Sequence, residues 1–227
     1  MPIIRQMYSE WNRLVVGRDK GGCENRVMRV ILTRETIQIP EEVTLTLENK
    51  TVTVTGVYGR EQRHFPCAQL DLQLQGHTLQ VSCWQADKKT RAMVGTVSGH
   101  IHNLITGVTA GYQLTTVTVY NHFPMNPVIA RDGHSVVIRN VMGGRRTRYV
   151  EMQGNTVYSP TTQERDVNVL KGTNLEDVTQ TAASLQRESK DDMKRDPVKF
   201  VDGIYRKKLE YQTEGYEPVQ RYTRNRK

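Results

Sequence analysis

Between residues 33 and 82, apolar and polar side chains alternate at the two-residue period of a β-strand. Thr44–Leu47 and Thr51–Thr55 combine threonines with leucines or valines, so each segment has one apolar face. Asn49-Lys50 lies between them and predicts a tight turn, and another strand is predicted at Thr78–Val81. This part of the chain is therefore expected to form a small sheet.

From residue 90 the period lengthens to that of an α-helix. Apolar residues recur every three or four positions and lie on one helical face: Val94, Val97, Ile101, Leu104, Ile105 and Val108. Thr90 is the predicted N-cap, because its hydroxyl can accept a hydrogen bond from an amide of the first turn. Gly111 stands where a helix commonly ends in a left-handed residue.

The second half of the chain follows the same order of strands and helix. Strands are predicted at Ser135–Ile138 and Asp166–Val169. A second helix is predicted to begin at Thr173, which stands three residues before Glu176 as in a capping box. Its apolar face comprises Leu175, Val178, Ala182 and Leu185.

A shift of 84 residues places the two halves in register, with Pro40 on Pro124 and Gly59 on Gly143. Similar patterns can arise by chance from binary patterning, but the matched prolines and glycines favour an internal duplication. The predicted fold class is α+β, with two tandem duplicated domains, each a small, mainly antiparallel sheet covered by one helix. The other face of each sheet is expected to stay free for contacts.

Positive charge is concentrated at the two ends of this chain of 227 residues, whose net charge is +8. Residues 1–32 contain 6 basic and 3 acidic side chains, and residues 187–227 contain 12 and 8. We therefore divide the chain into a basic extension (1–32), two α+β domains (33–127 and 128–190) and a basic tail (191–227). A neutral body with basic ends suits insertion into a nucleic-acid assembly, although charged, solvated tails are an alternative.

Each end of the chain carries its own prediction. Residues 1–27 lack clear periodicity and are expected to lie on RNA or a neighbouring protein, unless translation begins at Met28. In the tail, Asp196-Pro197 has the form of an N-cap followed by proline, and apolar residues recur at every third position from Val198 to Ile204. A short helix is predicted there, followed beyond Lys208 by residues without a fold of their own.

The chain lacks the common signatures of catalysis. It contains no GxxxxGK[ST], GxSxG, HExxH or GxGxxG motif. His100 and His102 are two residues apart on the first predicted helix, so they point to different sides and do not form a metal clip. No enzyme, cofactor or metal site is expected.

The cysteines and the hydropathy of the chain indicate the cellular compartment in which the protein is expected. The three cysteines are far apart and form no CxxC pair, which favours reduced thiols over a zinc site or a disulfide framework. No stretch reaches the roughly 18 apolar residues of a membrane span, and the N-terminus lacks the apolar core of a secretion signal. A cytoplasmic protein without a membrane partner is expected.

The segment 143–148 is a candidate for binding nucleic acid. Two glycines suit the tip of a tight hairpin after the strand at 136–138, and Arg145, Arg146 and Arg148 stand beside them. Arginine forks match the oxygens of a phosphate in pairs. An ordinary basic hairpin in solvent is the alternative.

The segment 199–208 combines an apolar anchor with basic side chains. These are Lys199, Arg206, Lys207 and Lys208, and Tyr205 could add a stacking contact with an unpaired base. A short anchored helix would direct these side chains toward RNA phosphates. A tail that only aids solubility is the alternative.

Several short motifs occur in a specific order and spacing. They are Ile39-Pro40, Val52–Gly56, Gly107–Gly111, Val119–Asn126, Ile138–Gly143, Leu170–Asn174, Ala182–Gln186 and Lys199–Tyr205. Together they resemble the universal large-subunit ribosomal protein six family, called large-subunit protein nine in eukaryotic numbering, over about residues 28–209. The His-Phe-Pro of 122–124 and the form of residues 199–205 resemble the eukaryotic branch.

The resemblance implies two α+β domains of common ancestry and a structural role in the large (60S) ribosomal subunit, in the cytoplasm, with a nucleolar stage during assembly. It implies contacts with large-subunit rRNA near the sarcin–ricin loop and stalk base, beside ribosomal proteins of the stalk base, where translational GTPases dock. The rRNA-binding candidates carried over by position are Arg145, Arg146, Arg148, Lys171, Lys199, Tyr205 and Arg206. Lys207 and Lys208 are added from their charge.

The chain departs from the family pattern in three places. Gly143–Arg146 replaces an expected Gly-Glu-Lys-like turn, Lys207-Lys208 and the tyrosine-rich end are unfamiliar, and residues 1–27 have no family counterpart. The alternative function is a free-standing regulatory RNA-binding protein. Against it, the chain has neither an RNP aromatic motif nor a KH-type GxxG context.

Overall fold

The two segments in which threonine alternates with leucine or valine form the two strands of a hairpin, as predicted. In the computed structural model, β2 (Thr44–Glu48) and β3 (Thr51–Gly56) pair antiparallel. Asn49 and Lys50 connect them with φ angles of 45° and 63°, as a two-residue hairpin turn with two left-handed positions requires. The structure describes residues 31–66, 69–161, 164, 166–190, 201–213 and 216.

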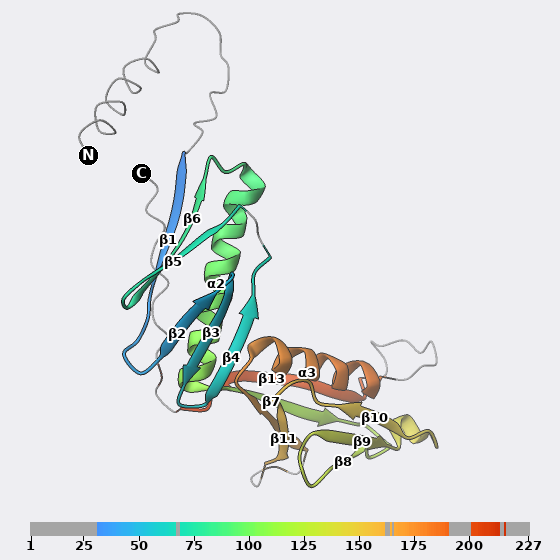
Figure 1. Cartoon of the computed structure of the whole chain (residues 1–227). Coiled ribbons are helices and arrows are strands. Elements are labelled where there is room, and N and C mark those ends of the chain that lie inside the picture. The colour runs from blue at the N-terminus through green and yellow to red at the C-terminus, as the bar shows by residue number, and fades with distance from the viewer. Residues whose placement is uncertain are drawn as a thin grey trace, which may run out of the picture. The chain divides into compact units, whose positions relative to one another are not determined.

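The first repeat, as far as the chain is described, places one helix on two small sheets (Figure 1). Its other elements are β1 (Leu32–Gln38), β4 (Gly59–His64), β5 (Asp71–Gln75), β6 (Thr78–Trp84) and α2 (Lys88–Ala110). The antiparallel sheets have the orders β1-β6-β5 and β2-β3-β4. The six apolar residues predicted for one face of the helix are all buried against these sheets.

The second repeat contains the same elements in the same order. They are β7 (Tyr112–Val119), β8 (Asn126–Ile129), β9 (Ser135–Arg139), β10 (Arg148–Glu151), β11 (Val157–Pro160), β12 (Val167–Gly172) and α3 (Leu175–Ser189), with a 3-10 turn, η1 (Val141–Gly143), after β9. The strand orders β7-β12-β11 and β8-β9-β10 match those of the first repeat. The predicted α+β duplication is confirmed, with two small sheets in each repeat instead of one.

The second repeat begins earlier in the chain than the boundary between the two domains that the sequence predicted. β7 lies within the range assigned to the first domain (33–127), but it pairs with β12 and contributes Tyr112 and Leu114 to the second core. Gly111 alone separates it from α2, and its φ of 66° ends that helix as predicted. No polar linker marks the boundary, because the helix passes directly into the next strand.

Neither helix begins at its predicted cap: the N-cap of α3 lies one residue after the predicted position and that of α2 three residues before it. α2 begins after Asp87, and Thr90 instead donates its hydroxyl to the side-chain oxygen of Gln69 at 2.9 Å. α3 begins after Asn174, whose side-chain oxygen accepts the amide of Glu176 at 3.1 Å. Asn174 is therefore the N-cap of α3, and the hydroxyl of Thr173 is free to donate to a residue of the other repeat.

The C-terminal segment forms a strand where the sequence predicted a helix. β13 (Gly203–Tyr211) runs antiparallel to β7 and extends its sheet to β11-β12-β7-β13. Of the predicted apolar stripe, Ile204 is buried but Val201 is 51% exposed. The open edge of β7 offers hydrogen-bond partners to the backbone of this segment, whereas a short isolated helix is marginally stable in water. The segment therefore forms a strand, which continues past Lys208.

Two predictions fall on other parts of the chain. The proposed start of the tail helix at Asp196-Pro197 lies outside the described residues, and so does the basic extension up to residue 30.

The two repeats meet where α2 ends and α3 begins. A Cβ at Gly107 would overlap the carbonyl oxygen of Thr173, so only glycine permits this approach. The hydroxyl of Thr173 donates across the contact to the carboxylate of Glu61 in β4. The backbone of one repeat therefore packs directly on the helix of the other.

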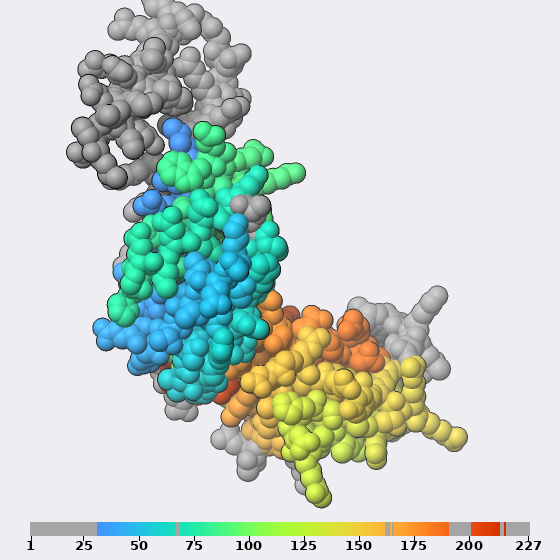
Figure 2. Space-filling view, viewed as in Figure 1, coloured from blue at the N-terminus to red at the C-terminus, as the bar shows by residue number. Residues whose placement is uncertain are grey.

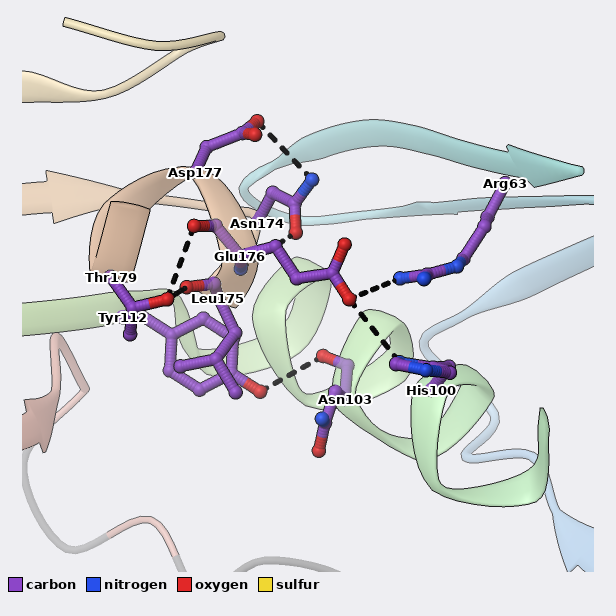
Figure 3. A network of polar contacts seen from close by, with 9 residues as sticks. All are labelled: Arg63, His100, Asn103, Tyr112, Asn174, Leu175, Glu176, Asp177 and Thr179. Atoms are coloured by element: carbon purple, nitrogen blue, oxygen red, sulfur yellow. Dashed lines mark hydrogen bonds and ion pairs between the residues drawn. The ribbon is translucent and has the colours of Figure 1, made fainter. Parts of the chain in front are cut away.

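A polar network surrounds this contact (Figure 3). One carboxylate oxygen of Glu176, in the first turn of α3, accepts a hydrogen bond from Arg63 at 2.6 Å and lies 3.3 Å from Nδ1 of His100. The hydroxyl of Tyr112 donates to the carbonyl oxygen of Asn103 at 2.9 Å. The charged groups are partly exposed, so the network fixes orientation more than it adds stability.

Replacing Gly107 by Ala tests the contact between the repeats. We expect the free energy of unfolding to fall by about 1–3 kcal/mol, because the new methyl group must displace the backbone at Thr173. Gly99→Ala on the same helix is the matched control, since no atom lies within 4 Å of its Cβ position. It should leave stability unchanged or raise it by up to about 1 kcal/mol. Urea unfolding measures both, and equal effects would contradict the close approach.

Candidate nucleic-acid interface

The connection between β9 and β10 is a turn built from left-handed residues. The φ angles of Asn140, Met142 and Gly143 are 60°, 48° and 76°. The amide of Gly144 donates to the carbonyl oxygen of Val141 at 2.9 Å, which closes the turn. β9 and β10 pair antiparallel on either side of it, as predicted, but the connection at 140–147 is longer than the tight hairpin that the two glycines predicted.

Aromatic side chains of the segment before β8 hold this turn in place. The ring of Phe123 lies against Gly143, where an added Cβ would be 3.0 Å from the ring. The side-chain amide of Asn140 donates to the carbonyl oxygen of Pro124 at 2.9 Å. His122 packs edge-on against Phe123 with ring centres 4.7 Å apart, and Phe123 remains 41% exposed.

The end of α3 and the start of β13 lie beside this segment. A carboxylate oxygen of Asp202 accepts the amide of Asn121 at 3.2 Å, and the hydroxyl of Ser189 accepts the amide of Ile204 at 2.9 Å. We call the region formed by residues 120–125, 140–147, 189–190 and 202–205 the distal end of the second repeat. In Figure 2 the yellow segment around the β9–β10 turn projects from the surface there.

The distal end presents two of the three predicted arginines to solvent. Arg145 and Arg146 are exposed on the turn. Arg148 is 8% exposed, and its guanidinium donates to the carbonyl oxygens of Glu188 and Lys190 at the C-terminus of α3. A cation that accepts the role of hydrogen-bond donor to the last carbonyl oxygens of a helix is stabilising. Arg148 therefore stabilises the fold, and we no longer propose it as a phosphate ligand.

The basic residues of the C-terminal segment lie along β13. Arg206, Lys207 and Lys208 are exposed, and a bulge at Lys207 shifts the register with β7. The ammonium group of Lys207 is 3.8 Å from Glu164, and that of Lys208 is 2.5 Å from Glu210. Such exposed pairs are weak, so an RNA phosphate can compete for these side chains. Lys199 lies outside the described residues.

Lys171 and Tyr205 lie on the face of the sheet that α3 does not cover. Lys171 pairs with Gln113 and Tyr205 with Val117, whereas α3 packs on the opposite face, which carries Leu114. Gln113 and Val117 are four residues apart on β7, so the two candidates are separated by about 13 Å along the strand. Lys171 is therefore near the first repeat, and Tyr205 belongs to the distal end.

The aromatic residues of the distal end were missed as candidates from the sequence. Tyr120, His122 and Phe123 are exposed beside the turn that carries Arg145 and Arg146. The motif was interpreted only as a family signature. The available sequence signal was that these aromatic residues lie together in a segment without the period of a strand or a helix.

Other chemistry is limited in the described part of the chain. No three histidine, cysteine or acidic residues there are grouped so that they could hold a metal ion. Within the same residues, no helix is long and apolar enough to cross a membrane. Cys83 is a buried free thiol, and burial raises its pKa.

The sequence is similar to those of known ribosomal proteins. The model of the family described as "Ribosomal protein L6" matches residues 39–111. Large ribosomal subunit protein uL6 of Tetrahymena thermophila is 34% identical over 179 residues, which cover 78% of this chain and 95% of the relative. The chain belongs to the ribosomal protein L6 family.

Two further uL6 proteins show how widely this similarity extends. Large ribosomal subunit protein uL6A of Schizosaccharomyces pombe is 34% identical over 78% of this chain and 93% of its own length. Large ribosomal subunit protein uL6 of Methanocella arvoryzae is 37% identical over 74% and 93%. The eukaryotic relatives support the eukaryotic branch of uL6 that the motifs predicted.

Arg148 and Arg145 can be distinguished by stability. Arg148→Gln should lower the free energy of unfolding by about 1–3 kcal/mol, because the partly buried carbonyl oxygens at the end of α3 lose their charged donor. Arg145→Gln should change it by less than about 0.5 kcal/mol, as expected for an exposed turn residue. Urea unfolding of the two variants compares them, and equal values would reject the capping role of Arg148.

Proposed function

We propose that the protein is a structural constituent of the large ribosomal subunit and binds rRNA through the distal end of its second repeat. The observation that carries the proposal is that exposed Arg145 and Arg146 lie on the β9–β10 turn and that the rings of His122 and Phe123 lie beside this turn. Membership of the uL6 family supports it, because the relatives are named large ribosomal subunit proteins.

The geometry of the distal end suits a folded RNA. Guanidinium forks can take phosphate oxygens in pairs, and exposed rings can stack on unpaired bases. Because Phe123 and Asn140 already hold the turn, little conformational freedom is lost on binding. The basic side chains at 206–208 extend the positive surface along β13.

The finer position follows from the family resemblance. We place the distal end on rRNA near the sarcin–ricin loop and the stalk base, beside the ribosomal proteins of the stalk base and near the docking site of translational GTPases. The protein then supports translation as part of cytoplasmic ribosomes, after nucleolar assembly. Its role is structural and not enzymatic, in keeping with the ribosomal family that it matches.

Charge reversal at the turn tests the proposed interface. Arg145→Glu with Arg146→Glu should reduce incorporation into large subunits, measured by co-sedimentation through a high-salt sucrose gradient. In titrations with an rRNA fragment, each lost phosphate contact should reduce the slope of log affinity against log salt by about 0.7 to 0.9. The free energy of unfolding should stay within about 0.5 kcal/mol of the parent, because the turn tip is exposed.

The matched control reverses two exposed charges of the first repeat, Arg60→Glu with Lys89→Glu. It makes the same change in net charge and should leave incorporation and the salt slope intact. An unchanged affinity and slope for the turn variant would reject the site. Wild-type protein that washes off the subunit in high salt would instead favour a free-standing regulatory RNA-binding protein.

A further inference from the structure

A cavity of about 480 Å³ lies in the first repeat, where β6 ends and α2 begins. Its volume is in the range of pockets that bind small molecules or single side chains. It lies at the end of α2 that is farther from the second repeat (Figure 1). The cavity is lined by Gln69, Asp71, Thr90 and the segment 84–87.

The indole of Trp84 forms part of the wall of this cavity, and it is 54% exposed. Ser82 stands two residues before Trp84 on β6, and Ser82 pairs with Asp71 of β5. Because side chains alternate along a strand, Trp84 and Asp71 lie on the same face of the sheet. An exposed indole presents apolar surface and the negative face of its ring, both of which suit a flat cation.

Two carboxylates are available at the cavity. Asp87 is the N-cap of α2, but its side chain makes no hydrogen bond to the amides of the first turn. Among the residues that the structure describes, neither Asp71 nor Asp87 forms an ion pair. The cavity is not lined by the basic residues that are nearest in register or sequence, which are Arg34, Lys88, Lys89 and Arg91. Its charged groups are therefore both negative.

Hydrogen bonds hold the walls of the cavity in place. The hydroxyl of Thr90 on α2 donates to the side-chain oxygen of Gln69 before β5 at 2.9 Å. Gln85 has a φ of 46°, a left-handed conformation that residues with long side chains rarely adopt, and its amide donates to the carbonyl oxygen of Ile31 at 2.7 Å. Backbone conformations of this kind cluster at binding sites. The cavity is therefore preformed.

We propose that this cavity binds the side chain of an arginine from a protein partner. The planar guanidinium can stack on the indole of Trp84 while its N–H groups donate to the carboxylates of Asp71 and Asp87. A lysine ammonium has neither the flat face nor the fork of donors. The two carboxylates repel an RNA phosphate, so the partner is a protein and not a nucleic acid.

The cavity is separate from the proposed rRNA interface. α2 has 23 residues and is therefore about 35 Å long. The cavity lies at its first turn, whereas Gly107 contacts the second repeat at its last turn. The protein can therefore bind rRNA through the second repeat and a basic protein segment through the first. This proposal does not rest on rRNA binding.

The fluorescence of Trp84 tests the proposal in the full-length chain. Trp11→Phe leaves Trp84 as the only tryptophan, and the probe is the peptide acetyl-Gly-Arg-Gly-amide at constant ionic strength. We expect a saturable change in the emission of Trp84, because the guanidinium stacks on its indole. The same peptide with citrulline in place of arginine has a similar shape and no charge. It should bind at least about tenfold more weakly.

Substitutions at the carboxylates provide the second arm of the test. Asp71→Asn and Asp87→Asn should each weaken binding of the arginine peptide by about tenfold, because each removes a charged acceptor. Asp132→Asn is the matched control, since Asp132 is exposed in the second repeat and does not line the cavity. It should leave binding unchanged.

Three results would overturn the proposal. They are the absence of a saturable change in emission, equal binding of the arginine and citrulline peptides, and equal effects of the cavity variants and the Asp132 control. The comparison of the two peptides leaves Asp71, Trp84 and Asp87 unchanged. It therefore decides the question even where a variant fails to fold.

Discussion

The structure depends on one close approach, between the last turn of α2 and the backbone that leads into α3. Only glycine at position 107 allows the carbonyl of Thr173 to reach the helix. The same approach brings Glu176 within reach of Arg63 and His100, and the chain that leaves β13 crosses beside it at Gly111. The contact between the two helices, the ion pairs and the segment that follows β13 therefore all lie near the end of α2. The distal end lies at the opposite end of the second repeat.

Much of the fold could be predicted because its helices bury one continuous face. The six apolar residues of α2 and the strands at 78–81, 135–138 and 166–169 follow from periodicity alone. The caps were misplaced because neighbouring polar residues compete for the same role. Asn174 caps α3 in place of Thr173, whose hydroxyl donates to Glu61 in the other repeat. That contact is between residues far apart in the sequence, and local pattern does not contain it.

The candidate site was predicted only in part for a similar reason. Arg145, Arg146 and Arg148 look alike in the sequence, but Arg148 begins β10 and shares its buried face with Val150, while Tyr149 between them is exposed. Strand alternation counted back from Val150 would have separated it from the other two. The strand β13 and the aromatic residues beside the turn depend on partners that only the folded chain brings together.

The pairing of β13 with β7 also affects how the chain is made. Tyr211 pairs with Tyr112, which leaves the ribosome 99 residues earlier. The first repeat has all its described strands and its helix once Ala110 has emerged, whereas the edge of β7 stays unpaired until nearly the whole chain has been synthesised. During that interval an open, strand-forming edge is exposed, the kind of surface on which nascent chains associate wrongly and to which chaperones bind. The edge of β7 therefore needs protection from such contacts until β13 has been synthesised.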